Sequence, residues 1–171
     1  EETMLLDPLA DLLRSIRLTS GVFFDASLAA PWCIDASIPA RARKTPWPRP
    51  NVIAYHLVIA GKMLVAVEGE PVMEVCAGEI VLLPRNDVHL LASGAGLRPT
   101  SVHDLLQPAD GGGLPRLCVR GRGEQTQLVC GFLGSDDADN PLIASLPRLL
   151  KVAIPTAAAR KWIETTIRFA A

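Results

Sequence analysis

The sequence predicts a mainly β domain whose strands close into an antiparallel barrel or sandwich and are followed by C-terminal helices. Short apolar runs separated by Gly and Pro fill residues 52–92, which is the rhythm of strands and turns. The chain has 13 Gly and 14 Pro but only 5% aromatic residues, a composition that suits short strands joined by many turns. Because many short strands leave exposed edges, we expect the sheet to close on itself.

Length, charge and cysteine spacing restrict the class of protein. The 171 residues suffice for one domain that buries a core without disulfides. A formal net charge of −1 excludes a disordered charged tail and argues against direct nucleic-acid binding by this chain. The sequence has no apolar run long enough to cross a membrane, and its N-terminus is acidic where a secretory signal would be basic. We therefore predict a cytoplasmic protein without a membrane partner, whose four scattered cysteines are reduced thiols.

The first fifty residues predict one helix and one loop. Asp7 can cap a helix that Pro8 opens, with apolar residues at helical spacing behind them, and Gly21 is expected to end it. An extended piece follows over residues 21–28. Residues 31–50 contain five prolines, which remove the backbone donors that a central strand needs, so this segment is predicted to be a surface loop.

The middle and end of the chain predict strands and then helices. The polar segment 93–113 is expected to connect two groups of strands, with one apolar patch at 102–106. After Asn140 and Pro141 the pattern predicts a short helix over 142–146 and a second helix over 156–171. On the second helix, Ala158, Trp162, Thr165 or Thr166, and Phe169 share a face that we expect to dock on the domain or on a partner helix. The predicted strands cover residues 52–59, 62–68, 71–76, 80–83, 89–92, 117–120 and 125–133.

One stretch carries a motif that the common enzyme signatures do not explain. The chain has no G-x-S-x-G, no phosphate-binding loop, no H-E-x-x-H and no C-x-x-C. It does have Gly78, Pro84, Asn86 and His89 in the order G-x5-P-x-N-x2-H. The glycine would begin an apolar strand, Pro84 and Asn86 would reverse the chain, and His89 would start the returning strand.

This stretch resembles the second motif of the cupin superfamily, whose members are small antiparallel β-barrels of the jelly-roll type. The resemblance implies that His89 points into the barrel and that His56, at the position of the first ligand histidine of the other cupin motif, faces it. Metal-dependent cupin enzymes usually continue with H-x-H and a nearby Glu. Here position 58 is Val, and residues 60–62 supply no carboxylate, so the usual four-ligand site is missing.

Taken in order, several segments resemble the cupin-type N-terminal sensor domain of AraC-type transcriptional regulators. In that family a DNA-binding helix-turn-helix domain follows the sensor, and we expect such a domain downstream of Ala171. The resemblance implies a sensor and effector-binding domain with an N-terminal helix at 1–155 and the start of a linker or dimerisation helix at 156–171. The segments that carry it are Asp7-Pro8-Leu9, Pro31-Trp32, His56-Leu57-Val58 with Gly61, residues 78–89, Gly123-Glu124-Gln125-Thr126, Leu128-Val129-Cys130-Gly131, Pro141-Leu142 and Leu146-Pro147.

Three residues form the candidate site that this fold would assemble. In a cupin barrel, His56 and His89 would face each other and the strand holding Cys130 could bring a thiolate beside them. Two imidazoles and a thiolate suit one transition-metal ion, zinc above all, with a fourth position open. The alternative is that the histidines are hydrogen-bonded core residues and Cys130 is a small core hydrophobe. Cys130 could also be a redox-sensing thiol, which requires a lowered pKa and solvent access.

Three arginines and one further histidine are also considered as functional residues. Arg116, Arg120 and Arg122 alternate along a strand and could point toward an anionic effector, although such rows are usually solvated. His103 lies in a predicted loop and is expected to be solvated.

Three functions are consistent with these observations. The leading hypothesis is the regulatory domain of a DNA-binding transcriptional regulator that responds to a small molecule, a metal or an oxidant. It would form a homodimer and reach DNA only through a downstream domain. The second is a metal-dependent cupin enzyme, an isomerase or dioxygenase using His56 and His89. The third is a dimerisation module, which predicts an interior filled by Leu, Val and Met side chains.

Overall fold

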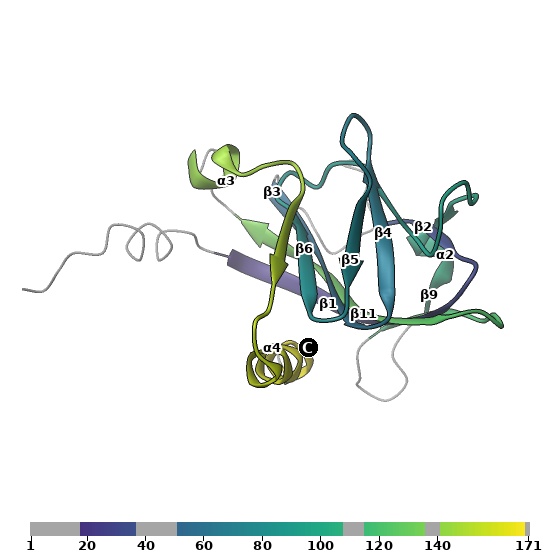
Figure 1. The fold of residues 1–171 in the computed structure, drawn as a ribbon. Helices are drawn as coiled ribbons and strands as arrows, with labels where there is room; N and C mark the ends of the chain where they lie inside the picture. Colours follow the sequence, from purple (N-terminus) through teal and green to yellow (C-terminus); the bar gives the residue numbers. More distant parts are fainter. Residues whose placement is uncertain (1–17, 37–50, 108–114, 136–140, 170–171) are drawn as a thin grey trace, which may run out of the picture.

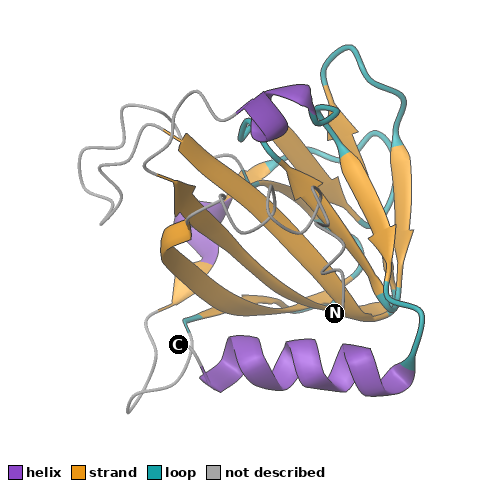
Figure 2. Ribbon diagram, turned by 90° about the vertical axis from the view of Figure 1, so that its left-hand side faces the viewer, coloured by secondary structure: helices purple, strands orange, loops and turns teal. Residues whose placement is uncertain are grey.

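The computed structural model describes residues 18–36, 51–107, 115–135 and 141–169. They form two β-sheets that face each other, with a helix close to the C-terminus lying beneath the strands (Figure 1, Figure 2). In chain order the elements are β1 (Leu18–Ala29), β2 (Cys33–Asp35), β3 (Asn51–Ala60), β4 (Lys62–Val67), β5 (Met73–Cys76), β6 (Glu79–Leu83), β7 (His89–Ala92), β8 (Thr100–Ser101), α2 (Val102–Leu105), β9 (Leu106–Gln107), β10 (Arg116–Val119), β11 (Gln125–Ser135), α3 (Pro141–Ser145), β12 (Leu150–Ala153) and α4 (Ala157–Phe169).

The larger sheet has the strand order β12-β6-β3-β11-β1-β10-β9 and the smaller one β5-β4-β7-β2-β8. Most pairings are antiparallel, but β1 pairs with β10 and β2 pairs with β8 in parallel. The predicted mainly β fold is therefore confirmed, with C-terminal helices after the strands. The described strands form two separate sheets and do not close into a continuous barrel.

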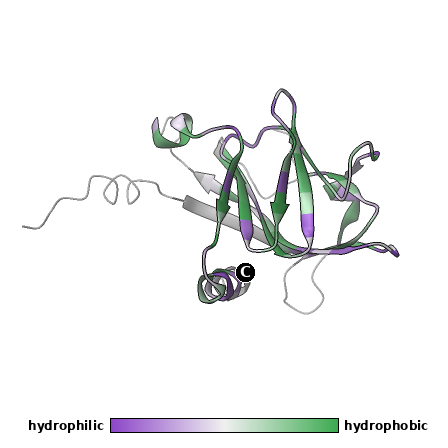
Figure 3. Cartoon of the chain, viewed as in Figure 1, coloured by the Kyte–Doolittle hydropathy of each residue, from purple (hydrophilic) through white to green (hydrophobic). Residues whose placement is uncertain are grey.

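The apolar core lies between the two sheets because the strands alternate inward and outward residues. In β4, Met63, Val65 and Val67 are buried while Lys62 is exposed. Leu91 of β7 and Leu83 of β6 fill the same interior. Figure 3 shows hydrophobic residues along the strands of both sheets. Burial of these side chains between the sheets is the main source of stability.

Strand β3 is buried on both of its faces, as is its neighbour β11 over residues 128–132. Ala54 and Val58 point into the core between the sheets. Leu57 points the other way and packs with Val129 and Ile154 in a second apolar cluster. The six consecutive residues from 53 to 58 are buried for this reason, and β3 reads as a continuous apolar run.

The second cluster lies under α4. The face of α4 that packs against it differs from the face that the sequence analysis predicted to dock. Ala159 and Ile163 pack against Leu57 and its neighbours. Trp162, expected to dock on the domain or on a partner helix, is 69% exposed. Its docking on the domain is a wrong prediction, because the stripe that includes Ala159 and Ile163 faces the sheet and the adjacent stripe faces solvent. Its docking on a partner helix stays a prediction.

Turns with left-handed backbone conformations join the central strands. Gly61, between β3 and β4, has φ +76°, and a Cβ there would collide with the backbone carbonyl oxygen of Gln125. Gly78, between β5 and β6, has φ +87° and is covered by the Arg160 side chain of α4. Asn86 adopts φ 48° in the turn before β7, a conformation that Asn tolerates better than most residues.

Most predicted strands lie within two residues of the observed ones, and three other predictions need correction. Gly21 was expected to end a helix, but it lies inside β1, which begins at Leu18. The predicted loop 31–50 contains β2, and the predicted connection 93–113 contains β8, α2 and β9. The predicted N-terminal helix up to residue 17 and residues 37–50 of the predicted loop lie outside the described residues. Within the described part of the chain, no helix has the length and apolar character needed to span a membrane.

The Gly61→Ala substitution is expected to lower the free energy of unfolding by about 2–3 kcal/mol, because it combines a left-handed backbone with a collision against Gln125. Urea denaturation of the purified chain measures this. Gly94→Ala is the matched control, since no atom of the described residues lies within 4 Å of a Cβ placed at Gly94. It should cost less than about 0.5 kcal/mol. Equal losses in the two variants would contradict the assignment of the turn.

Candidate functional site

The candidate site is a pair of histidines that joins the two sheets across the core. His56 lies on the inner face of β3 in the larger sheet, and His89 is the first residue of β7 in the smaller one. Both side chains have 0% exposure. Their Nε2 atoms are 2.9 Å apart, which is a hydrogen-bond distance. The structure therefore brings together the two histidines that the sequence analysis singled out.

The hydrogen bonds fix where the protons of a neutral pair must lie. His89 Nδ1 is 2.7 Å from the backbone carbonyl oxygen of Asp87, so this nitrogen donates. The other ring nitrogen of neutral His89 is then an acceptor, and His56 Nε2 donates to it. His56 Nδ1 is left as a buried acceptor without a hydrogen-bond partner among the described residues. A buried polar atom without a partner costs free energy and is a feature that calls for a functional explanation.

Burial keeps both rings neutral. The pKa of His56 is lowered well below its usual value, first by burial and then by the proximity of His89. The pKa of His89 is also lowered by burial, against the opposing effects of the Asp87 carbonyl and the Asp35 and Asp87 carboxylates. The neutral pair is thus the stable form at neutral pH, in agreement with the proton positions above.

Cys130, the third residue of the predicted site, is a buried thiol on the strand next to His56. It lies on β11 directly opposite His56 in the β3–β11 ladder, and it is buried. Burial, followed by the charge of Asp25, raises the pKa of its thiol. A redox-sensing thiol needs a lowered pKa and access to solvent, and Cys130 has neither.

In this arrangement the two imidazoles are hydrogen-bonded to each other. Two nitrogens bound to one tetrahedral zinc ion lie about 3.3 Å apart with the ion between them, whereas these two share a proton at 2.9 Å. Among the described residues, no group of three or more His, Cys, Asp or Glu side chains is placed to hold an ion. The zinc site at His56, His89 and Cys130 stays a prediction that metal analysis must test.

A small cavity of about 10 Å³ lies beside His56 and Cys130 between the sheets. Apolar side chains such as Phe24, Leu28 and Leu117 form its walls. This volume holds about one water molecule, so a larger effector could enter only if side chains or sheets moved. The Leu-, Val- and Met-rich interior is what the dimerisation-module hypothesis predicted.

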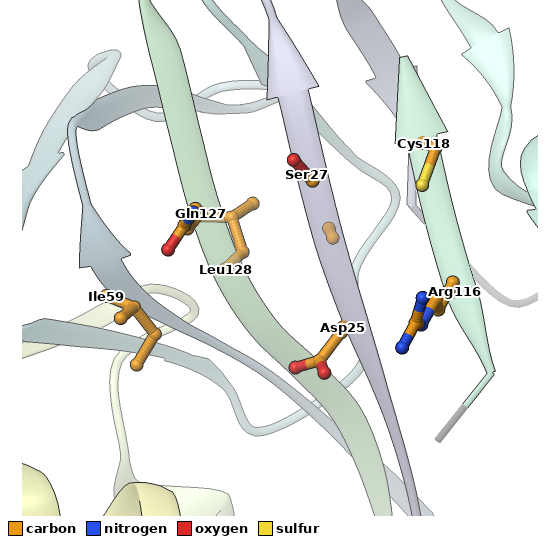
Figure 4. A pocket seen from close by; sticks show the side chains of 8 residues that line it. Asp25, Ser27, Ile59, Arg116, Cys118, Gln127 and Leu128 are labelled. Atoms are coloured by element: carbon orange, nitrogen blue, oxygen red, sulfur yellow. The ribbon is translucent and has the colours of Figure 1, made fainter. Parts of the chain in front are cut away.

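A larger groove of about 400 Å³ lies on the outer face of the seven-stranded sheet, where Asp25, Ser27, Arg116 and Cys118 lie on neighbouring strands (Figure 4). Arg120 lines an adjoining hollow that also includes Ser27 and Cys118. All three arginines of the predicted row are exposed, but only Arg116 lies on a strand, where Asp25 is its partner in the β1–β10 ladder. Arg120 and Arg122 follow the end of β10, so the prediction that the three alternate along one strand is wrong. His103 is exposed on α2, as expected.

Sequence reasoning missed two charged residues that hold the histidine pair in place. Arg148 donates from Nη2 to Asp87 Oδ1 at 3.0 Å, and the carbonyl of the same aspartate accepts from His89. Asp87 lies inside the recognised motif at a variable position. Arg148 is 61 residues away along the chain, and no local signal links the two.

The comparison with protein families assigns the chain to the cupin family. The family model described as Cupin matches residues 7–171, which is nearly the whole chain. The chain therefore belongs to this family, and the cupin resemblance found in the sequence is confirmed. No curated protein matches the chain.

Among solved structures, the chain is similar to ToxT from Vibrio cholerae. The unsaturated-fatty-acid-bound wild-type ToxT of strain SCE256 is 11% identical with a TM-score of 0.47, covering 87% of this chain and 46% of ToxT. The apo K231A variant is 11% identical with a TM-score of 0.45, covering 85% and 46%. ToxT of strain O395 is 11% identical with a TM-score of 0.43, covering 85% and 44%. The chain thus spans less than half of ToxT.

Acid is expected to destabilise the fold through the histidine pair. Their pKa values are lowered on folding, so below the usual value of 6.5 the unfolded chain binds more protons than the folded one. Stability should therefore fall as the pH falls from about 6.5, by about 1.4 kcal/mol per pH unit for each histidine. Urea denaturation between pH 8 and pH 5 measures the slope. His56→Phe should flatten it, and His103→Gln should not; equal slopes in all three proteins would contradict the assignment.

Metal analysis tests the zinc prediction directly. After incubation with zinc and dialysis, we expect the chain to retain less than one equivalent of metal, because the two Nε2 atoms are hydrogen-bonded to each other. Elemental analysis by mass spectrometry measures the retained zinc. One equivalent that is retained by the unaltered chain and lost in both His56→Ala and His89→Ala would instead establish the metal site.

Proposed function

We propose that this chain is the ligand-responsive regulatory domain of a DNA-binding transcriptional regulator, with its effector acting at the interior site beside His56 and His89. The observation that carries the proposal is the buried His56 Nδ1, an acceptor without a described partner beside an apolar cavity. A small apolar molecule with one hydrogen-bond donor would satisfy this atom and displace the surrounding side chains. Small-molecule sites are usually apolar with a few polar groups that fix orientation.

The position of β3 gives such a site a direct connection to the C-terminal helix. His56 faces the interior, and Leu57, its neighbour in the chain, contacts the cluster under α4. A ligand that shifts β3 therefore moves the surface on which Ala159 and Ile163 pack. An effector changes an equilibrium only by favouring one of two arrangements, and here these would be two positions of α4 on the sheet.

The rest of the proposal concerns what lies outside this chain. DNA binding would belong to a helix-turn-helix domain following residues 156–171, which fits the net charge of −1. The exposed Trp162 on α4 supports a homodimer made through this helix. The protein would act in the cytoplasm. The competing metal-dependent enzyme is disfavoured by Val58 and by the absence of a third metal-binding side chain within the described residues.

Binding measurements on the purified chain test the proposal. One probe is oleic acid, because ToxT has been solved with an unsaturated fatty acid bound. Its carboxyl group would have to bind in the protonated form to donate to His56 Nδ1. The other probe is the pool of compounds that native mass spectrometry finds bound to the purified chain. We expect at least one of them to bind and to change the fluorescence of the three tryptophans of the chain. His56→Phe should weaken that binding about threefold to tenfold, because it removes one hydrogen bond.

Matched variants decide where the effector binds. Arg116→Gln alters the outer groove and should leave the affinity unchanged. Binding that resists His56→Phe and is lost in Arg116→Gln would move the site to the outer face. A chain that binds neither oleic acid nor any co-purifying compound would contradict the regulatory proposal and favour a dimerisation module.

A further inference from the structure

We infer that the ion pair between Asp87 and Arg148 transmits the state of the interior histidine pair to the C-terminal segment formed by residues 141–169. This inference rests on the proposed function, since it names the contact by which the interior site would control α3, β12 and α4. It concerns four side chains and one backbone carbonyl, whose contacts form an unbroken chain from the core to the surface.

The chain of contacts begins in the core. His56 Nε2 donates to His89 Nε2 across 2.9 Å, and His89 Nδ1 donates to the Asp87 carbonyl across 2.7 Å. The carboxylate of the same aspartate accepts from Arg148 Nη2 across 3.0 Å. Asp87 therefore holds the buried ring with its backbone and the C-terminal segment with its side chain. A change in the orientation of the His89 ring reaches Arg148 through one residue.

Arg148 connects several parts of the fold at one guanidinium group. Its Nη1 donates to the carbonyl of Glu68 across 3.0 Å and lies 3.7 Å from the Glu70 carboxylate. These residues form the turn between β4 and β5 in the smaller sheet. Arg148 itself precedes β12, which pairs with β6 in the larger sheet. The smaller sheet and the C-terminal segment are thus tied together at the residue that contacts Asp87.

The turn that carries Asp87 is anchored at a second point. Arg85 Nη2 donates to the carbonyls of Ala144 and Leu146, at 2.9 and 3.1 Å, at the end of α3. Asn86 closes the turn by donating its backbone N–H to Leu83 across 3.0 Å. Because Arg85 and Asp87 both bind the C-terminal segment, a shift of this short turn is passed on rather than absorbed. Distant sites are coupled physically by networks, such as hydrogen-bond networks, that can switch between two discrete arrangements.

A second route through the backbone competes with this one. His56 is opposite Val81 in the β3–β6 ladder, and Val81 is opposite Lys151 in the β6–β12 ladder. A disturbance at His56 could reach β12 along these strands without Arg148. Lys151 is a matched control for this route, because it too tethers β12: its Nζ donates to the Glu74 carbonyl across 3.0 Å and lies 3.4 Å from the Glu79 carboxylate. The side chains of Arg148 and Lys151 are 36% and 35% exposed.

Hydrogen exchange in a double-mutant cycle separates the two routes. The readout is the exchange rate of amides in residues 141–153 of the full chain, normalised to those of β4. His56→Phe breaks the first bond of the network and should speed this exchange at least about threefold, as expected for coupled residues. The same change should add almost nothing in an Arg148→Gln background and should keep its full effect in a Lys151→Gln background. An effect that persists in Arg148→Gln, or that is absent in every background, overturns the inference.

A reverse measurement keeps the inference testable if His56→Phe does not fold. Arg148→Gln changes only a surface side chain, and the ring resonances of His56 and His89 can be followed by NMR at pH 7.5. They should shift in Arg148→Gln and stay in place in Lys151→Gln. Unchanged ring resonances in Arg148→Gln overturn the inference. Neither experiment uses an effector. The inference about the Asp87–Arg148 contact can therefore be contradicted while the proposed effector binding is upheld, and effector binding can be contradicted while the inference is upheld.

Discussion

The fold depends on the burial of strand β3 on both of its faces. Its inward residues meet the smaller sheet, and its outward Leu57 meets the cluster beneath α4. A strand in this position cannot shift its register, because a one-residue slip would exchange its inner and outer side chains. It also cannot respond to a change on one face without affecting the other. The same burial that stabilises the domain therefore links its interior to its C-terminal helix.

The histidine pair is the polar exception within this apolar core. Two neutral imidazoles satisfy each other and the Asp87 carbonyl, while one ring nitrogen of His56 stays without a described partner. Leucine or phenylalanine at these positions would avoid that cost. Violations of core packing rules are expected at functional sites, which is why we place the proposed effector here.

Much of the fold could be predicted from local signals. Gly61 and Gly78 mark turns because both need a left-handed backbone, and the apolar runs between such turns became strands close to the predicted bounds. His56 and His89 were found because their motifs have a fixed order and spacing. The packed face of α4 was not predictable, since two adjacent helical stripes both carry apolar residues. The sheet accepts the smaller side chains Ala159 and Ile163 and leaves Trp162 in solvent.

The sequence by itself determined the mainly β fold, the cupin family and the two interior histidines, because strand periodicity, turn residues and short motifs are local properties. The tertiary structure decided the rest. The pairing of the two rings, the neutral thiol of Cys130 and the contact between Asp87 and Arg148 depend on which distant strands and loops meet. Asp87 and Arg148 are 61 positions apart, and each by itself is an ordinary charged residue. Only the folding of the C-terminal segment back onto the turn before β7 gives the pair a role.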